Sequence, residues 1–403
     1  MRQTGTGFNG PALAVERMPG AIWYPNAGMN FTENTLRHVL RPQCADIVAI
    51  RLITEDNRVR SLTWHQLHNQ VASLARALSA LGVQPGERVA AVLPYIPEAI
   101  IGLLATASLG AIWTINSPEL SVTATLDRLD QLQPVVLIGA SHYRFNGKDV
   151  DCRAQLRTLP DKLPSLRHTI VVNDPDQADN APSHRQLLDF TTLVNDTAEP
   201  AYTPVPFDHP LWILFSSGTT GKPKGIVHGH GGMTLEALKF DALNHDVGSA
   251  NVYYVGANTS WMVWNTLAYN LMCGASVVTY AGSPTFGRAD RQFDIIARTG
   301  TTTFAHARPT CLLYKTRTSV PGATGTFRSC DRSCPPARRF STAPGSGCTN
   351  TSKPTSISDR TQVAPKSAVP SSVPIRSNQS TWVDCRAPSS AQRCKPGMIP
   401  VPA

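Results

Sequence analysis

The sequence predicts an α/β protein in which largely parallel sheets are flanked by helices. Segments with apolar residues at helical spacing alternate with short apolar runs along residues 1–308. The short runs are continuous rather than alternating, as expected for strands that are buried on both faces of a parallel sheet. The 403 residues are also enough for one or two domains with a sizeable core.

The predicted elements follow one another in a βαβ rhythm. Residues 63–81 have the apolar spacing of a helix, and residues 88–93 form a short apolar run. Residues 98–109 predict a second helix, and residues 135–139 a second buried strand. A further strand is expected at 211–215. Because α/β proteins bind ligands beyond the carboxyl ends of parallel strands, we expect a site directly after this strand.

A segment rich in glycine and hydroxyl groups, from Phe215 to Gly225, follows this last strand. Its glycines allow close backbone approach, its hydroxyls donate to phosphate oxygens, and its lysines supply positive charge. The loop therefore predicts a triphosphate clamp, with a solvated surface loop as the alternative. It is not a Walker P-loop, because Lys222 is followed by Pro223 rather than Ser or Thr. The candidate phosphate-binding residues are Ser216, Ser217, Gly218, Thr219, Thr220, Gly221, Lys222 and Lys224.

The chain shows no membrane or secretory signal. It has no run of eighteen apolar residues, and its N-terminus has no apolar segment like that of a signal peptide. Cys44, Cys152 and Cys273 are widely spaced, which favours structural thiols in a reducing compartment over disulfides or a zinc site. A cytoplasmic location without a membrane span is expected.

Two histidines, His228 and His230, lie close to the loop. If both are on one strand, their side chains point to opposite faces and do not easily bind one metal ion. We therefore leave both out of the predicted site.

The segment from Phe215 to Gly225 resembles the signature loop of adenylate-forming enzymes, the acyl-CoA synthetase and luciferase superfamily. Its Ser-Gly-Thr-Thr-Gly core and the following Pro-Lys-Gly carry this resemblance. Other segments narrow it. Residues 19–25 and 29–36 are similar to the N-terminal segment of the acetyl- and acetoacetyl-CoA synthetase branch, and residues 226–232, 258–265 and 280–284 resemble acetoacetyl-CoA synthetases more than acetyl-CoA synthetases.

The resemblance implies an N-terminal segment at 1–45 and an incomplete AMP-binding (adenylation) domain at 46–303. It implies an acid-thiol ligase that joins acetoacetate to CoA through an acyl-adenylate, with ATP, Mg²⁺ and CoA as reactants and cofactor. In such an enzyme, the hydroxyls of the loop bind the β- and γ-phosphates. Lys224 adds positive charge, and Lys222 stands at a variable position of the pattern. Small-molecule substrates are the expected partners, and nucleic acid is not.

An acyl pocket is implied at Trp261, Met262 and Val263, since this segment lines that pocket in the family. The alternative is that these apolar residues are simply core. The catalytic lysine that the resemblance implies belongs to a C-terminal domain without a counterpart in this sequence. No catalytic residue and no metal ligand is therefore assigned.

The composition changes abruptly near residue 303. Residues 309–403 contain 13 Lys and Arg, three Asp and no Glu, so the whole positive excess of the chain lies there. They also hold 13 of the 32 prolines and six of the nine cysteines, with no helical or alternating period. A low-complexity basic tail over 304–403 that does not fold is expected.

A shifted reading frame explains this tail. When the codons of residues 358–368 are regrouped from their third base, they admit Gly-Ser-Asn-Ser-Gly-Gly-Thr-Glu-Ile-Gly, which resembles the adenine- and acyl-binding motif of the family. Residues 392–399 regroup in the same frame to Ala-Val-Gln-Ala-Trp-Asp-Asp, which also resembles the branch. The motifs that complete the nucleotide site are then absent as side chains, so we expect the 403-residue chain to be inactive.

Two other functions stay open at this point. One is another short-chain acyl-CoA synthetase that uses acetate or propionate. The other is a non-catalytic nucleotide-binding protein whose basic tail binds nucleic acid.

Overall fold

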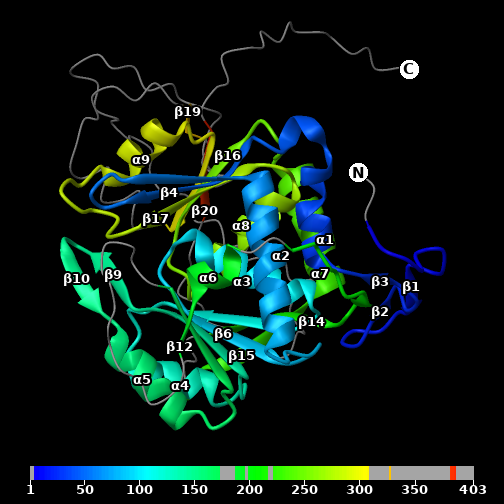
Figure 1. Ribbon diagram of the computed structural model, residues 1–403. Helices are drawn as coiled ribbons and strands as arrows, with labels where there is room; N and C mark the ends of the chain where they lie inside the picture. Colours follow the sequence, from blue (N-terminus) through cyan, green and yellow to red (C-terminus); the bar gives the residue numbers. More distant parts are fainter. Residues whose placement is uncertain are drawn as a thin grey trace, which may run out of the picture.

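The computed structural model describes residues 4–172, 187–195, 198–216 and 221–307, together with two short strands at 326–327 and 382–386. Two seven-stranded sheets form its frame, one in the lower half of Figure 1 and one in the upper half. Within these residues no helix is long and apolar enough to cross a membrane.

The first sheet has the strand order β12-β11-β8-β6-β7-β14-β15. Its neighbours pair in parallel, except for the antiparallel pair of β14 with β15. Its strands are β6 (Arg88–Val92), β7 (Ile112–Asn116), β8 (Val136–Ala140), β11 (His168–Val172), β12 (Leu187–Asp189), β14 (Pro210–Ser216) and β15 (Lys224–Gly229).

The second sheet has the order β19-β20-β18-β16-β17-β4-β5. The four strands β18, β16, β17 and β4 are parallel, and antiparallel strands flank them on both sides. Its strands are β4 (Val48–Thr54), β5 (Val59–Thr63), β16 (Val252–Gly256), β17 (Ser276–Ala281), β18 (Thr303–Ala307), β19 (Thr326–Phe327) and β20 (Trp382–Arg386).

Helices fill the space between the two sheets, where they share one large apolar core with both of them (Figure 1). These inner helices are α1 (Phe31–Leu36), α2 (Trp64–Ala80), α3 (Pro97–Ser108), α7 (His230–Ala237) and α8 (Met262–Met272). A second core forms where two helices cover the other face of the first sheet, namely α4 (Val122–Leu129) and α5 (Arg153–Lys162). The remaining helices are α6 (Phe190–Val194), α9 (Arg291–Thr299), η1 (Arg37–Leu40), η2 (Pro42–Cys44) and the π-helical turn η3 (Leu238–Asn244).

Alternate residues of the central strands belong to different cores. In β6, Val89 and Ala91 pack into the core between the sheets, whereas Ala90 and Val92 pack against the outer helices. Successive side chains of a strand point to opposite faces, so a strand buried on both faces must be apolar throughout. This explains why the predicted strands read as continuous apolar runs.

The predicted elements are confirmed in type and place. Helices α2 and α3, and strands β6, β8 and β14, occupy the predicted ranges to within two residues at each end. Helix α2 begins at a capping box, in which Gln66 N donates to Thr63 Oγ1 at 3.2 Å and Thr63 N donates to Gln66 Oε1 at 2.9 Å. The α/β class with mostly parallel sheets is therefore confirmed.

His228 and His230 do not lie on one strand. Strand β15 ends at Gly229, which caps α7, and His230 is the first residue of that helix. The backbone of Asp208 lies so close to Gly229 that a Cβ there would be 3.1 Å from the Asp208 carbonyl oxygen. The close approach favours glycine at the point where the strand turns into the helix.

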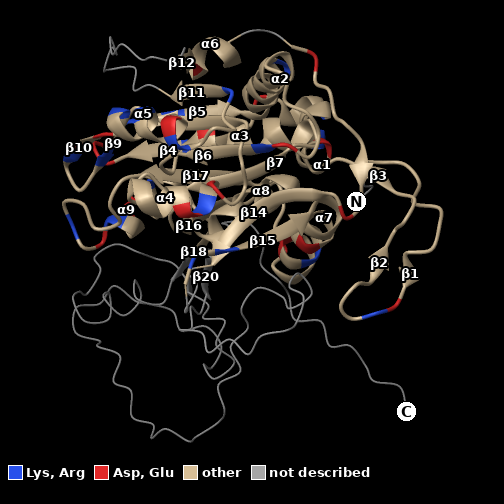
Figure 2. Ribbon diagram, turned by 90° about the horizontal axis from the view of Figure 1, so that it is seen from below, with Lys and Arg blue, Asp and Glu red and all other residues tan. Residues whose placement is uncertain are grey.

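Three two-stranded sheets complete the fold. Positions of acidic and basic residues are interspersed along the ribbon of the body, and the hairpin of β1 (Leu13–Val15) and β2 (Ile22–Trp23) extends away from it (Figure 2). Strand β3 (Gly28–Met29) pairs with β13 (Val205–Pro206). The hairpin of β9 (His142–Phe145) and β10 (Lys148–Asp151) follows the carboxyl end of β8.

Most of the predicted tail lies outside the described residues. Within 304–403 the structure describes the rest of β18 and the strands β19 and β20, and β20 pairs antiparallel with β18.

Candidate functional site

The carboxyl edges of the two sheets meet in the folded chain. The segment after β16 belongs to the second sheet, yet it bonds to the ends of two strands of the first. Thr259 Oγ1 donates to the carbonyl of Leu93, just after β6, at 2.8 Å. Ser117 N, just after β7, donates to Ser260 Oγ at 2.7 Å. Loops from both sheets are thereby held on one side of the molecule, where α/β proteins bind their ligands.

The glycine- and hydroxyl-rich loop opens at this same edge. Strand β14 is parallel to β7, so its last residue, Ser216, lies at the carboxyl edge. Ser216 pairs with Lys224, the first residue of β15. The predicted residues Ser217, Gly218, Thr219 and Thr220 lie outside the described residues. The loop thus joins two antiparallel strands, unlike a Walker loop, which leads from a strand into a helix.

The second arm of the loop is exposed and carries positive charge. Lys222 and Lys224 are both exposed, and neither forms an ion pair with a described residue. Gly221 has a φ of +145°, a conformation that side chains rarely adopt. The carbonyl of Pro223 accepts a hydrogen bond of 3.1 Å from Gln131 Nε2, which ties this arm to the segment after α4. Two exposed lysines without an ion pair to a described residue, in the arm that pairs with the strand end at Ser216, suit a polyanionic ligand.

The predicted acyl segment begins α8 at the same edge. Trp261 precedes the helix, and 55% of its surface is exposed. Met262 packs against the main core while partly buried, and Val263 is buried within it. Met262 and Val263 therefore fit the alternative that this segment is part of the core. Trp261 does not, because its exposed ring is available to a ligand.

Sequence reasoning missed a carboxyl group beside this segment. Glu119 follows β7, and burial raises the pKa of its carboxyl, while a hydrogen bond with the Asn258 side chain lowers it. A polar Ser-Pro-Glu directly after an apolar strand was the available signal. Within the described ranges, no three His, Cys, Asp or Glu side chains form a group that could hold a metal ion.

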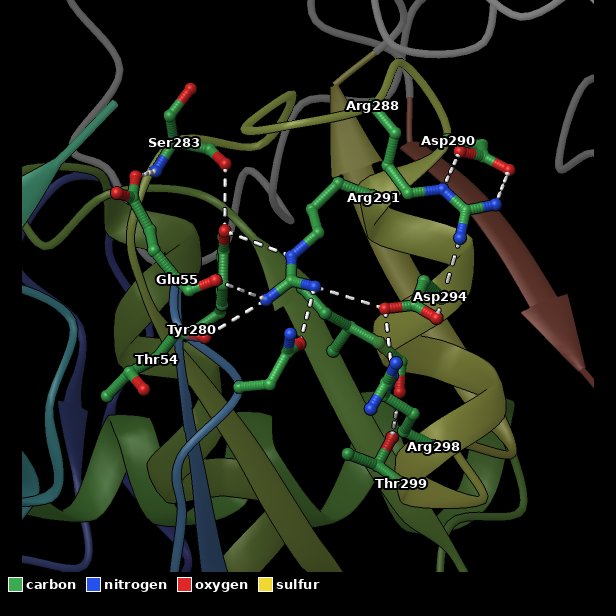
Figure 3. A network of polar contacts seen from close by, with 12 residues as sticks. Thr54, Glu55, Tyr280, Ser283, Arg288, Asp290, Arg291, Asp294, Arg298 and Thr299 are labelled. Atoms are coloured by element: carbon green, nitrogen blue, oxygen red, sulfur yellow. Dashed lines mark hydrogen bonds and ion pairs between the residues drawn. The ribbon is translucent and has the colours of Figure 1, made fainter. Parts of the chain in front are cut away.

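A buried carboxylate, Glu55, makes a second tie between the sheets. It follows β4 of the second sheet and is 2% exposed. It accepts hydrogen bonds from Asn146 N at 2.6 Å and Gly147 N at 2.8 Å, both in the β9–β10 turn. It also accepts one of 2.6 Å from Ser283 N, in the segment after β17 (Figure 3). One carboxylate therefore fixes three loops at the joined carboxyl edges.

Arg291 supports the same region from α9. Its guanidinium donates to the carbonyls of Thr54 and Glu55 at 3.0 and 3.2 Å and to Asp294 Oδ2 at 3.1 Å (Figure 3). It also contacts Tyr280, whose hydroxyl donates to the Ser283 carbonyl at 3.0 Å. These bonds satisfy a buried charge and order the loops without leaving an obvious ligand contact.

The two histidines near the loop are held by the fold. Trp212 Nε1 donates to His228 Nδ1 at 2.8 Å, and Phe31 N donates to His230 Nδ1 at 3.2 Å. Burial lowers the pKa of both rings, in His230 to about 3. Both imidazoles are thus neutral acceptors at Nδ1, which is a structural role.

Comparison with known proteins decides the family. The sequence profile of the family described as AMP-binding enzyme matches residues 37–315. This chain belongs to the AMP-binding enzyme family. The AMP-binding match covers the first sheet, the strands β4, β5, β16, β17 and β18 of the second sheet, the glycine- and hydroxyl-rich loop and the start of α8.

Two relatives and one solved structure that match this chain are acetoacetyl-CoA synthetases. An acetoacetyl-CoA synthetase of Danio rerio is 32% identical over 316 residues, which are 76% of this chain and 46% of the relative. One of Rhizobium meliloti is 38% identical over 286 residues, 70% of this chain and 43% of the relative. The solved structure of acetoacetyl-CoA synthetase from Streptomyces lividans matches with a TM-score of 0.74 and 41% identity, covering 78% of this chain and 48% of that one. The chain spans less than half the length of these relatives.

Proposed function

We propose that this AMP-binding chain carries the phosphate and acyl subsites of an acetoacetate-CoA ligase. The observation that carries the proposal is the junction of the carboxyl edges through Thr259 and Ser260. It puts the end of β14, where the Phe215–Gly225 loop opens, on the same side as the start of α8. A reaction between a carboxylate and a nucleotide triphosphate needs both subsites side by side.

The reaction forms an acyl-adenylate. A carboxylate oxygen of acetoacetate bonds to the α-phosphorus of ATP, and the bond from that phosphorus to the pyrophosphate oxygen breaks. The CoA thiol then attacks the acyl carbon, and AMP leaves. Enzymes of this family use ATP and CoA as reactants and Mg²⁺ as a cofactor.

The loop stabilises the triphosphate in this reaction. We assign the binding of the β- and γ-phosphates to the hydroxyls of Ser216, Ser217, Thr219 and Thr220. Gly218 and Gly221 allow the backbone to approach the phosphates closely. Lys224 and Lys222 neutralise negative charge on the phosphates. This assignment is supported by two exposed lysines that form no ion pair with a described residue and by the place of Ser216 at the carboxyl edge. Among the described residues no three His, Cys, Asp or Glu side chains form a group that could hold a metal ion, so no Mg²⁺ ligand is assigned and no step passes through the ion.

The acyl group is assigned to the start of α8. The exposed ring of Trp261 covers the substrate, and Met262 and Val263 form the apolar floor below it. In this proposal residues 1–45 are the N-terminal segment, 46–303 the adenylation domain and 304–403 the out-of-frame tail. A cytoplasmic location remains part of the proposal.

The preference of the enzyme among short-chain carboxylic acids tests this proposal directly. One base is added or removed between codons 300 and 310, so that the downstream codons are read in the frame that encodes the adenine motif. The resulting enzyme should form its CoA thioester faster from acetoacetate than from acetate or propionate. Faster turnover of acetate would instead assign the chain to another short-chain acyl-CoA synthetase.

A further inference from the structure

One buried side chain of α8 has both of its polar atoms without a partner. Asn265 is 1% exposed, and neither its Nδ2 nor its Oδ1 makes a hydrogen bond with any described residue. A buried carboxamide without partners costs stability, because it has lost its hydrogen bonds to water. Such groups in native proteins call for an explanation, and ligand binding is one.

The helix geometry directs Asn265 toward β14. Tyr269 lies one helical turn after Asn265 on the same face, and its ring stacks on Trp212 of β14, with 6.1 Å between the ring centroids. Helix α8 starts at the carboxyl edge and runs inward, so Asn265 is about 6 Å nearer that edge than Tyr269. One further turn toward the edge is the exposed Trp261.

The amide therefore lies below the proposed acyl entrance. Trp212 and Ser216 are four residues apart along β14, so their side chains lie on the same face of the strand. The face that contacts Tyr269 therefore also carries Ser216, where the glycine- and hydroxyl-rich loop begins. If an acid enters at Trp261 with its carboxylate toward this loop, its acyl chain lies next to Asn265.

On the basis of the proposed function, we propose that the Asn265 carboxamide selects 3-oxo acids by donating a hydrogen bond from Nδ2 to the 3-oxo oxygen. A saturated acid of equal length offers no acceptor there and leaves the amide unpaired. A site built to bond a polar substrate group discriminates strongly against the analogue that lacks it. Asn265 would thus determine specificity while Trp261, Met262 and Val263 provide the apolar walls.

The test compares acetoacetate with butyrate on the 403-residue chain. Ligand-observed NMR measures both dissociation constants for the wild type, for Asn265→Leu and for Asn270→Leu. Asn270 is a matched control, because it is also buried in α8 but already donates from Nδ2 to the Thr266 carbonyl at 2.8 Å. The wild type and Asn270→Leu should bind acetoacetate on the order of tenfold more tightly than butyrate, and Asn265→Leu should bind both equally.

Two further readouts separate a specific role from a folding defect. Asn265→Leu should unfold at the same or a higher temperature than the wild type, because it removes two unpartnered polar atoms. The C3 resonance of bound [3-¹³C]acetoacetate should lie further downfield in the wild type than in Asn265→Leu, because the variant removes the hydrogen bond to this carbonyl.

The outcomes distinguish this inference from the function on which it rests. If Asn265→Leu keeps the preference for acetoacetate, or the bound C3 resonance is the same in the wild type and Asn265→Leu, the role of Asn265 is overturned and the acyl site stands. If the wild type binds neither acid but binds tripolyphosphate, the acyl site and the role of Asn265 both fail while the phosphate assignment stands.

Discussion

Ser260 Oγ accepts a hydrogen bond of 2.7 Å from Ser117 N, and this bond joins the segment before α8 to the end of β7. Ser117 is buried, so its N–H has no ready access to water. The bond therefore belongs to the structure that places the two proposed subsites on one side of the chain.

Replacing Ser260 by Ala should lower the free energy of unfolding by about 1–3 kcal/mol, since a buried donor is left unpaired. Urea denaturation measures this change. Ser79→Ala is the control, because Ser79 is exposed near the end of α2 and the substitution should change stability by less than about 0.5 kcal/mol. Equal effects of the two substitutions would show that the Ser260 bond does not hold the edges together.

Glu55→Ala should be more damaging. The substitution removes the acceptor of three backbone N–H groups, and hydrogen bonds to a charged group are stronger than those between neutral groups. We expect a loss of about 3 kcal/mol or more, measured by denaturation. Limited proteolysis should at the same time cut within the β9–β10 turn. The exposed Glu16 provides the control, and a Glu55→Ala chain as stable as Glu16→Ala would rule out this tie.

His230 should make stability depend on pH. Burial, and to a smaller extent His209, lower the pKa of folded His230 to about 3, from an ordinary value of 6.5. Between these values the unfolded chain binds more protons than the folded chain, so stability is complete above pH 6.5 and falls as the pH drops toward 3.

From pH 6.5 to 5 the contribution of His230 to this loss is about 2 kcal/mol. His230→Asn keeps an acceptor for Phe31 N but does not titrate, so its stability should fall less steeply over this range in urea denaturation. The same slope in both proteins would mean that His230 is protonated in the folded chain.

The reading frame can be examined without the protein. Sequencing the gene around codons 300–310 should reveal one missing or extra base, after which the adenine motif is read in frame. The 403-residue chain should show no acetoacetate-dependent exchange of pyrophosphate into ATP above background, because that motif is absent as side chains. Clear exchange would contradict our account of what the chain lacks.

The fold was largely predictable from the sequence because its central strands are buried on both faces. That burial requires continuous apolar runs such as β6, and the capping residue Thr63 marks the start of α2. The start of α7 at His230 was not predictable from spacing, since the close approach of Asp208 to Gly229 is a tertiary contact.

The site was predictable only in part. The loop residues carry a local pattern, so the sequence predicted a loop from Phe215 to Gly225, and in the structure β14 ends at Ser216 and β15 begins at Lys224. Glu55 and Asn265 have no such pattern, because their importance depends on burial and on partners far away in the chain. Glu55, for instance, bonds to Ser283, 228 residues later. Such contacts follow from the meeting of the two sheets.

Binding of inorganic tripolyphosphate to the 403-residue chain, measured by calorimetry, tests the central claim most directly. The wild type should bind it in a salt-dependent manner, and Lys224→Ala should weaken binding about tenfold. Lys148→Ala, which removes an exposed lysine from β10, should leave the affinity unchanged. Equal affinity in the wild type and Lys224→Ala, or no binding at all, would contradict the assignment of the Phe215–Gly225 loop as the triphosphate site.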